Sequence, residues 1–65
     1  MYFVFYNTND VFVAEEKLQK QKISVEVVPT PVQDKAYCGV CAMVSRADED
    51  AAVQALVGME YKIVN

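Results

Sequence analysis

The sequence has 65 residues, of which 54% are hydrophobic, well above the level of a disordered chain. Six Lys and Arg against nine Asp and Glu give a net charge of −3, which argues against a nucleic-acid partner and an anionic membrane surface. No apolar run approaches the roughly 18 residues of a membrane span, and the apolar start lacks the basic leader of a signal peptide. We therefore expect a single cytoplasmic domain over residues 1–65, with its thiols reduced.

The first elements along the chain are a strand and a helix. The run Tyr2–Tyr6 is β-branched and aromatic throughout, which predicts a central strand. The cluster Asn7–Asp10 consists of turn and N-cap residues, and helical spacing follows it to about Gln21. The predicted buried positions of this helix are Val11, Ala14 and Leu18.

A second strand is predicted over Ile23–Val28, where apolar and polar residues alternate. The segment Pro29-Thr30-Pro31 should end its ladder, because each proline lacks an N–H donor. Residues Val32–Tyr37 then form a predicted polar loop.

The second half repeats the order strand, helix, strand. Gly39–Ser45 is the third predicted strand, and its faces separate Val40, Ala42 and Val44 from Cys41 and Met43. A helix is expected from Arg46 to Val57, with a cap at Ser45 or Asp48. We expect Gly58 to stop it. Tyr61–Val64 is the last predicted strand.

The order strand-helix-strand-strand-helix-strand predicts an α+β, ferredoxin-like βαββαβ fold. In this fold, a four-stranded antiparallel sheet carries both helices on one face. Right-handed crossovers place the first and third strands in the centre and leave the other two as edges. We expect the second sheet face to carry aromatic side chains and to be only partly covered. An exposed face of this kind favours a homodimer in so small a chain.

Both cysteines lie in the stretch Tyr37–Cys41, three positions apart. In a fully extended chain the Cα atoms of Cys38 and Cys41 are about 10 Å apart, too far for a disulfide. A redox interpretation therefore predicts a bend at Gly39, with regular strand pairing only after Cys41. The pair begins a strand rather than a helix, so the sequence does not predict the helix-based thiol activation of thioredoxins.

Two other interpretations of the cysteines stay open. A metal site needs more ligands, because structural zinc takes four and the chain has no His. The thiolates of two chains, or Asp34 as a weak helper, would have to complete it. Alternatively both cysteines are inert, Cys41 as a small core residue, and the chain is a non-catalytic protein-interaction module.

The chain resembles the selenium/sulfur carrier protein-like family, a group of very short bacterial domains. The resemblance is carried by Thr8 at the start of the helix, Ala14-Glu15 within it, Pro29-Thr30-Pro31, and Cys38-Gly39 before an apolar strand. It implies that Cys38 carries sulfur or selenium as a persulfide-type adduct. Members often have basic residues where this chain has Val32 and Met43.

Cys41 is additional to the single-cysteine pattern of that family. It is placed to resolve a persulfide on Cys38 by forming a disulfide and releasing sulfide. The leading hypothesis is a carrier or accessory protein rather than a stand-alone enzyme, with no cofactor and with a protein donor or acceptor as partner. Gly39 is expected to permit the bend, and Pro29, Thr30 and Pro31 to hold the opposing loop rigid.

Overall fold

The computed structural model describes residues 1–31 and 37–64. In chain order the elements are β1 (Tyr2–Val4), α1 (Thr8–Lys20), β2 (Glu26–Pro29), β3 (Val40–Met43), the 3-10 turn η1 (Arg46–Asp48), α2 (Glu49–Ala55) and β4 (Lys62–Val64). Each predicted strand and helix is present, and most are a few residues shorter than expected. The predicted loop before Tyr37 lies outside the described residues.

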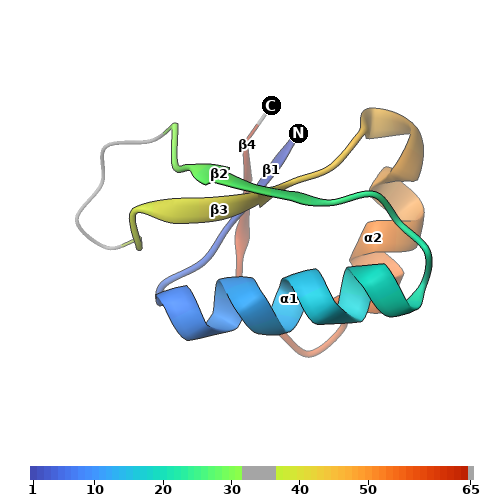
Figure 1. Cartoon of the computed structure of the whole chain (residues 1–65), viewed down its shortest axis with the longest axis horizontal. Coiled ribbons are helices and arrows are strands. Elements are labelled where there is room, and N and C mark those ends of the chain that lie inside the picture. The colour runs from blue at the N-terminus through green and yellow to red at the C-terminus, as the bar shows by residue number, and fades with distance from the viewer. Residues whose placement is uncertain (32–36, 65) are drawn as a thin grey trace.

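The four strands form one antiparallel sheet in the order β2-β3-β1-β4 (Figure 1). The central strands β1 and β3 pair with Phe3 opposite Ala42, and β4 pairs with β1 on the other side. This confirms the predicted α+β, ferredoxin-like arrangement, including the central and edge positions of the strands. Because β1 and β3 are antiparallel, the end of β1 lies beside the beginning of β3.

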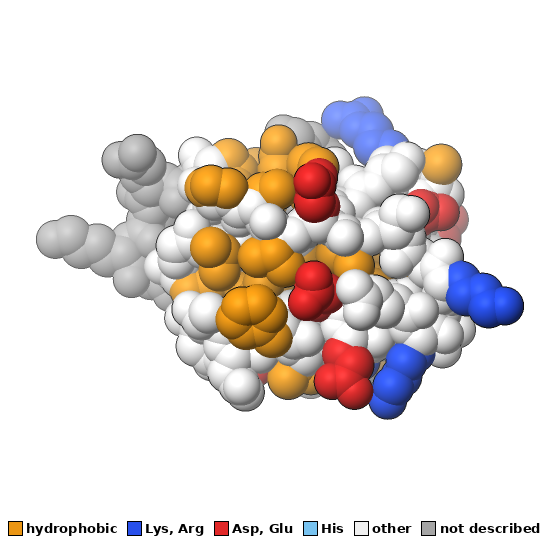
Figure 2. Space-filling model, in the orientation of Figure 1, with side chains coloured by type: hydrophobic (Ala, Val, Ile, Leu, Met, Phe, Trp, Pro, Cys, Tyr) orange, Lys and Arg blue, Asp and Glu red, His pale blue; other side chains and the backbone are white. Residues whose placement is uncertain are grey.

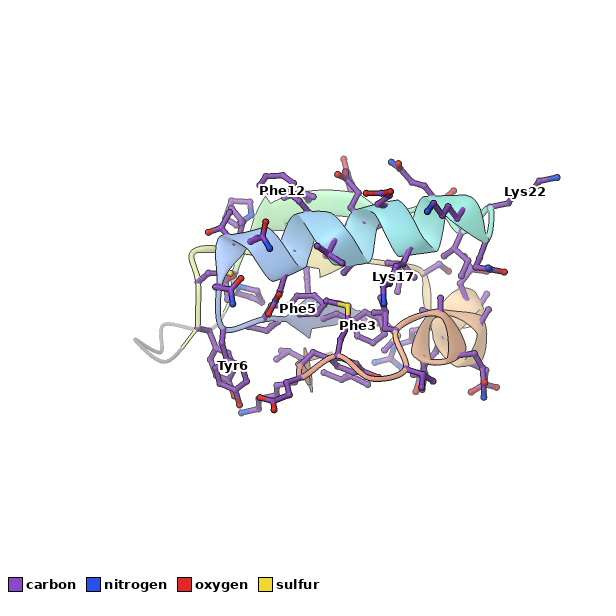
Figure 3. The ribbon with its side chains drawn as sticks, turned by 90° about the horizontal axis from the view of Figure 1, so that it is seen from below. Phe3, Phe5, Tyr6, Phe12, Lys17 and Lys22 are labelled. Carbon is purple, nitrogen blue, oxygen red and sulfur yellow. The ribbon has the colours of Figure 1, made fainter. Side chains whose placement is uncertain are left out.

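The core lies between the helices and one face of the sheet. Phe3 and Phe5 are fully buried there. In Figure 3 they lie on the sheet side of α1, whereas Phe12 points away from the core. The predicted helix positions Val11, Ala14 and Leu18 are all buried, as are Ala52 and Leu56 of the second helical region. The periodicity of three to four residues therefore identified the faces that pack.

Side chains and a glycine set the ends of the helices. The Asn7 side chain accepts a hydrogen bond of 2.8 Å from the backbone N–H of Asp10, which caps α1. The Ser45 hydroxyl accepts from the Ala47 N–H and caps η1. Beyond α2, Gly58 adopts a φ of +92°, a left-handed conformation that favours glycine. Within the described residues, no helix is long and apolar enough to cross a membrane.

The second face of the sheet carries the aromatic side chain of Tyr2. Directly paired strand residues share a face, so Tyr2, Met43 and Val64 lie together there and are half-buried. Because side chains alternate along the strand, Phe3 and Phe5 point towards the helices. Tyr2 is the aromatic residue of β1 that lies on the second face. Val4 and Cys41 are fully buried on the second face, outside the main core cluster.

Candidate thiol site

The backbone of Cys38 is fixed at the end of the sheet where β3 begins. Its N–H donates to the carbonyl of Phe5 over 3.0 Å. Its carbonyl accepts a 2.9 Å hydrogen bond from the Thr30 hydroxyl. The Thr30 N–H donates to the carbonyl of Gly39, also over 2.9 Å. Cys38 is therefore held from two sides, by the end of β1 and by the residue that follows β2.

The thiol of Cys38 is the more accessible of the two. The residue is half-buried, and its side chain packs against the core cluster on the helix side of the sheet. Its sulfur lies 3.0 Å from the carbonyl oxygen of Val40, to which the S–H donates. This contact gives the thiol a defined orientation at the edge of the core.

Cys41 occupies a different environment, inside the β-ladder. It is paired with Val4 on one side and Val28 on the other, and it is fully buried. Its sulfur lies 3.9 Å from the carbonyl oxygen of Pro29. Burial raises the pKa of the Cys41 thiol, a hydrogen bond with Thr30 lowers it, and the neighbouring Cys38 charge raises it. The Cys41 thiol is thus less readily ionised in the folded chain than an ordinary cysteine thiol.

The two thiols lie on opposite faces of the sheet. Cys38, just before β3, packs against the core cluster on the helix side, whereas Cys41 pairs with Val4 on the second face, outside that cluster. Both cysteines are free and are not at disulfide distance. The redox interpretation required pairing to begin after Cys41. In fact the ladder begins at Val40, opposite Pro29.

The chain bends at Gly39, but the backbone conformation there does not require a glycine. Residue 39 lies at a bend, but its φ is outside the left-handed region. A Cβ placed on it would meet nothing within 4 Å. The sequence correctly places a bend at this position, and the structure gives no steric reason for a glycine there.

An aromatic pair flanks Cys38 on its N-terminal side. The rings of Tyr6 and Tyr37 stack, with centroids 5.0 Å apart and planes inclined by 24°. Tyr6 is half exposed, and hydrogen bonding with Tyr37 raises the pKa of its hydroxyl. The pair ties the residue before Cys38 to the chain segment between β1 and α1.

The metal interpretation gains no ligand from the described residues. Among residues 1–31 and 37–64, no three His, Cys, Asp or Glu side chains come together as a metal site would require. The predicted helper Asp34 lies outside the described residues.

Two features of this site escaped sequence reasoning. The first is the start of α1, which lies at the same end of the molecule as the start of β3 (Figure 1). Phe5, which precedes the turn into α1, accepts a hydrogen bond from the Cys38 N–H. The antiparallel pairing of the first and third strands is the signal that would have indicated it. The second is the hydrogen bond from the Thr30 hydroxyl to the Cys38 carbonyl, because the sequence predicted Thr30 only as part of a rigid opposing loop.

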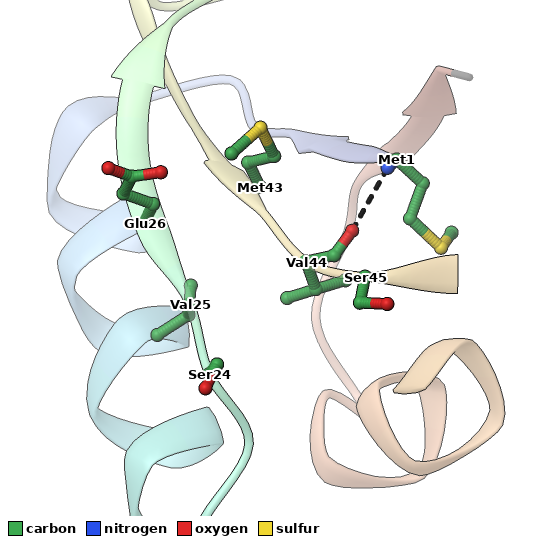
Figure 4. Close-up of a pocket in the computed structure, with 7 residues that line it drawn as sticks. All are labelled: Met1, Ser24, Val25, Glu26, Met43, Val44 and Ser45. Carbon is green, nitrogen blue, oxygen red and sulfur yellow. Dashed lines mark hydrogen bonds between the residues drawn. The ribbon is translucent and has the colours of Figure 1, made fainter. Parts of the chain in front are cut away.

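A separate cavity of about 470 Å³ lies at the opposite ends of β2 and β3. Figure 4 shows Val25 and Glu26 on one side and Met43 and Val44 on the other. The strands diverge here because Val44 exchanges backbone hydrogen bonds with Met1 instead of pairing with β2. Neither cysteine lines this cavity.

The fold and the half-exposed cysteine at the head of β3 define a small α+β protein with a candidate thiol site. Residues 1–64 match the family model described as "Putative Se/S carrier protein-like". The chain belongs to this family, which confirms the resemblance found in the sequence. Comparison with curated proteins and with solved structures finds no match.

Proposed function

We propose that the chain is a sulfur or selenium carrier that holds its cargo on the Sγ atom of Cys38. The family name supports carriage of these elements. The observation that supports Cys38 as the attachment point is the contrast in burial between the two thiols. Cys38 is half-buried and Cys41 is fully buried, so an approaching donor reaches Cys38 first.

The loading step is a transfer of sulfane sulfur between thiols. The Cys38 thiolate attacks the terminal sulfur of a donor persulfide, R–S–SH. A new S–S bond forms on Cys38, the donor S–S bond breaks, and the donor leaves as R–S⁻. No net oxidant or reductant is consumed. A selenium atom takes the place of the transferred sulfur in the equivalent selenium step.

For Cys41 we propose the role of a resolving thiol that acts only after local opening. In the folded ladder its sulfur is buried and faces away from Cys38. Attack on a Cys38 persulfide therefore requires the pairing of Val40 with Pro29 to be broken first. When the ladder is closed, Cys41 contributes to the packing of the second sheet face.

Inorganic polysulfide tests this assignment directly. After brief treatment and removal of excess reagent, intact-mass measurement should show one added sulfur atom on the wild-type chain. Cys38→Ser should abolish the addition, and Cys41→Ser should retain it and hold the persulfide longer. Loading of Cys41 in the Cys38→Ser chain, or no loading of the wild type, contradicts the proposal.

The partner is proposed to be a protein donor or acceptor in the reducing cytoplasm. Figure 2 shows hydrophobic side chains gathered over β2 and the beginning of α1, with acidic side chains among them, while basic side chains lie towards the other end. Phe12 of α1 is 53% exposed. A partner surface that is apolar and basic fits this face by charge and polarity.

A second candidate function is a homodimeric interaction module whose cysteines are inert. The half-buried apolar side chains on the second sheet face support it, because a second copy would cover them. Failure of both cysteines to take up sulfur, together with a stable dimer, would favour this alternative.

A further inference from the structure

Thr30 forms two hydrogen bonds with the chain at Cys38 and Gly39. Its hydroxyl donates to the Cys38 carbonyl over 2.9 Å, and its N–H donates to the Gly39 carbonyl over the same distance. These contacts extend the pairing of β2 with β3 by one residue, beyond the last ladder pair of Pro29 with Val40.

These two hydrogen bonds are important at this position because Pro29, the residue before Thr30, cannot donate a backbone hydrogen bond. A proline lacks an N–H, so the end of β2 depends on Thr30 to hold the chain around Cys38. A threonine hydroxyl has one proton to donate, and here the proton is used by the Cys38 carbonyl. The segment that must move for the two thiols to meet is the segment that Thr30 holds.

We propose that the Thr30 hydroxyl is a latch that keeps Cys38 and Cys41 on opposite faces of β3, so that resolution of a Cys38 adduct waits until this hydrogen bond is released. Thr30 is a positioning residue in this scheme, since it acts through the backbone that carries the thiols. The biological role of this latch rests on the proposed carrier function. Its effect on the two thiols can be tested without bound sulfur or selenium.

The step that the latch delays is a thiol–disulfide exchange. The Cys41 thiolate attacks the inner sulfur of the Cys38 persulfide. The Cys38–Cys41 bond forms, the bond to the outer sulfur breaks, and the outer sulfur leaves as HS⁻. Without cargo, a diazene oxidant such as diamide drives the same pairing. It takes the two thiol hydrogens and two electrons and is reduced to a hydrazine.

The test compares rates of Cys38–Cys41 disulfide formation in diamide, followed by intact mass after acid quenching. Thr30→Val keeps the N–H bond to Gly39 and the branched shape, and it removes only the hydroxyl. We expect it to form the disulfide about fivefold faster, which corresponds to the net value of one hydrogen bond. Thr30→Ser restores the hydroxyl and should return the rate to that of the wild type.

Two variants control for general loosening of the fold. Ser45→Ala removes the η1 cap at the other end of β3, and Thr8→Val makes the same chemical change at an exposed helix position. Neither should accelerate the disulfide. An unchanged or slower rate in Thr30→Val, or equal acceleration in Ser45→Ala, overturns the latch.

If Thr30→Val does not fold, the wild-type chain still decides the question. Alkylation of Cys41 in low urea should show a much weaker urea dependence than global unfolding, because a local opening exposes little surface. Alkylation that follows only global unfolding overturns the latch. Polysulfide loading is scored separately, so a chain that takes up no sulfur but shows the Thr30 effect refutes the carrier function and not the latch.

Discussion

At the scale of single residues, the environment separates two cysteines that are three positions apart. Cys38 lies at the head of a strand, reachable from solvent, with its backbone bonded to Phe5 and Thr30. Cys41 lies inside the ladder and is fully buried. One thiol is thus reachable from solvent in the folded chain, while burial favours the neutral form of the other.

The raised pKa of Cys41 predicts a pH-dependent loss of stability on the alkaline side. A thiol whose folded pKa lies above its ordinary value of 9.0 is more readily kept neutral in the fold than in the unfolded chain. The contribution of this thiol to the free energy of unfolding is therefore complete at pH values below its ordinary pKa. It is lost as the pH rises through its pKa in the folded chain. The free energy of unfolding, from urea titrations, should fall more steeply between about pH 8 and 10 in the wild type than in Cys41→Ala.

The comparison with Cys41→Ala isolates this thiol. Tyr6 titrates in both chains, so its contribution to the slope cancels. At pH 7 the variant should lose about 1 kcal/mol, from reduced packing alone. If the free energy of unfolding falls equally with pH in the two chains across the alkaline range, the pKa of Cys41 is not raised by folding.

At the scale of elements, the two helices and β3 follow the pattern of their residues. Val11, Ala14 and Leu18 recur at helical intervals and are all buried, and Ala42 and Val44 alternate with Cys41 and Met43 as strand residues do. The ends were less predictable. Residues at strand ends have the same β propensity as those inside, but there the partner strand decides where pairing stops.

The N-terminus of α1 depends on one polar side chain. Replacement of Asn7 with Ala removes the acceptor for the Asp10 N–H and should cost about 1 kcal/mol in the free energy of unfolding. The cap also fixes the turn that leads from Phe5, so the alkylation rate of Cys38 should rise in this variant. Circular dichroism in urea and thiol alkylation are the two measurements.

Asn9→Ala is the matched control for the capping prediction. Asn9 is exposed within the first turn of α1, and Ala has the higher helix propensity, so stability should stay the same or rise slightly. Equal losses in both variants would mean that the Asn7 cap adds nothing beyond helix propensity.

At the scale of the whole molecule, both helices of the described residues cover the same face of the sheet. Tyr2, Met43 and Val64 lie on the second face. We expect a second copy to cover it, because a 65-residue chain buries too little surface to be very stable alone. Sedimentation velocity should therefore show a dimer at micromolar concentration.

A charge on this face should separate the copies. Met43→Asp is expected to weaken dimerisation about tenfold or more, since an unpaired carboxylate is costly to bury. Val57→Asp introduces the same charge at a position that is 70% exposed beside α2 and should have no effect. A monomer in the wild type, or equal effects in both variants, contradicts a dimer through the sheet face.

The sequence by itself determined the order of elements, the buried helix faces, the ferredoxin-like arrangement and the bend at residue 39. Local patterns suffice for these, because periodicity, caps and prolines act within a few residues. Only the tertiary structure showed that the Thr30 hydroxyl donates to the Cys38 carbonyl and that the Cys38 N–H donates to Phe5, which precedes the turn into α1. Those contacts join residues far apart along the chain, since they depend on the register of β2 with β3 and of β3 with β1.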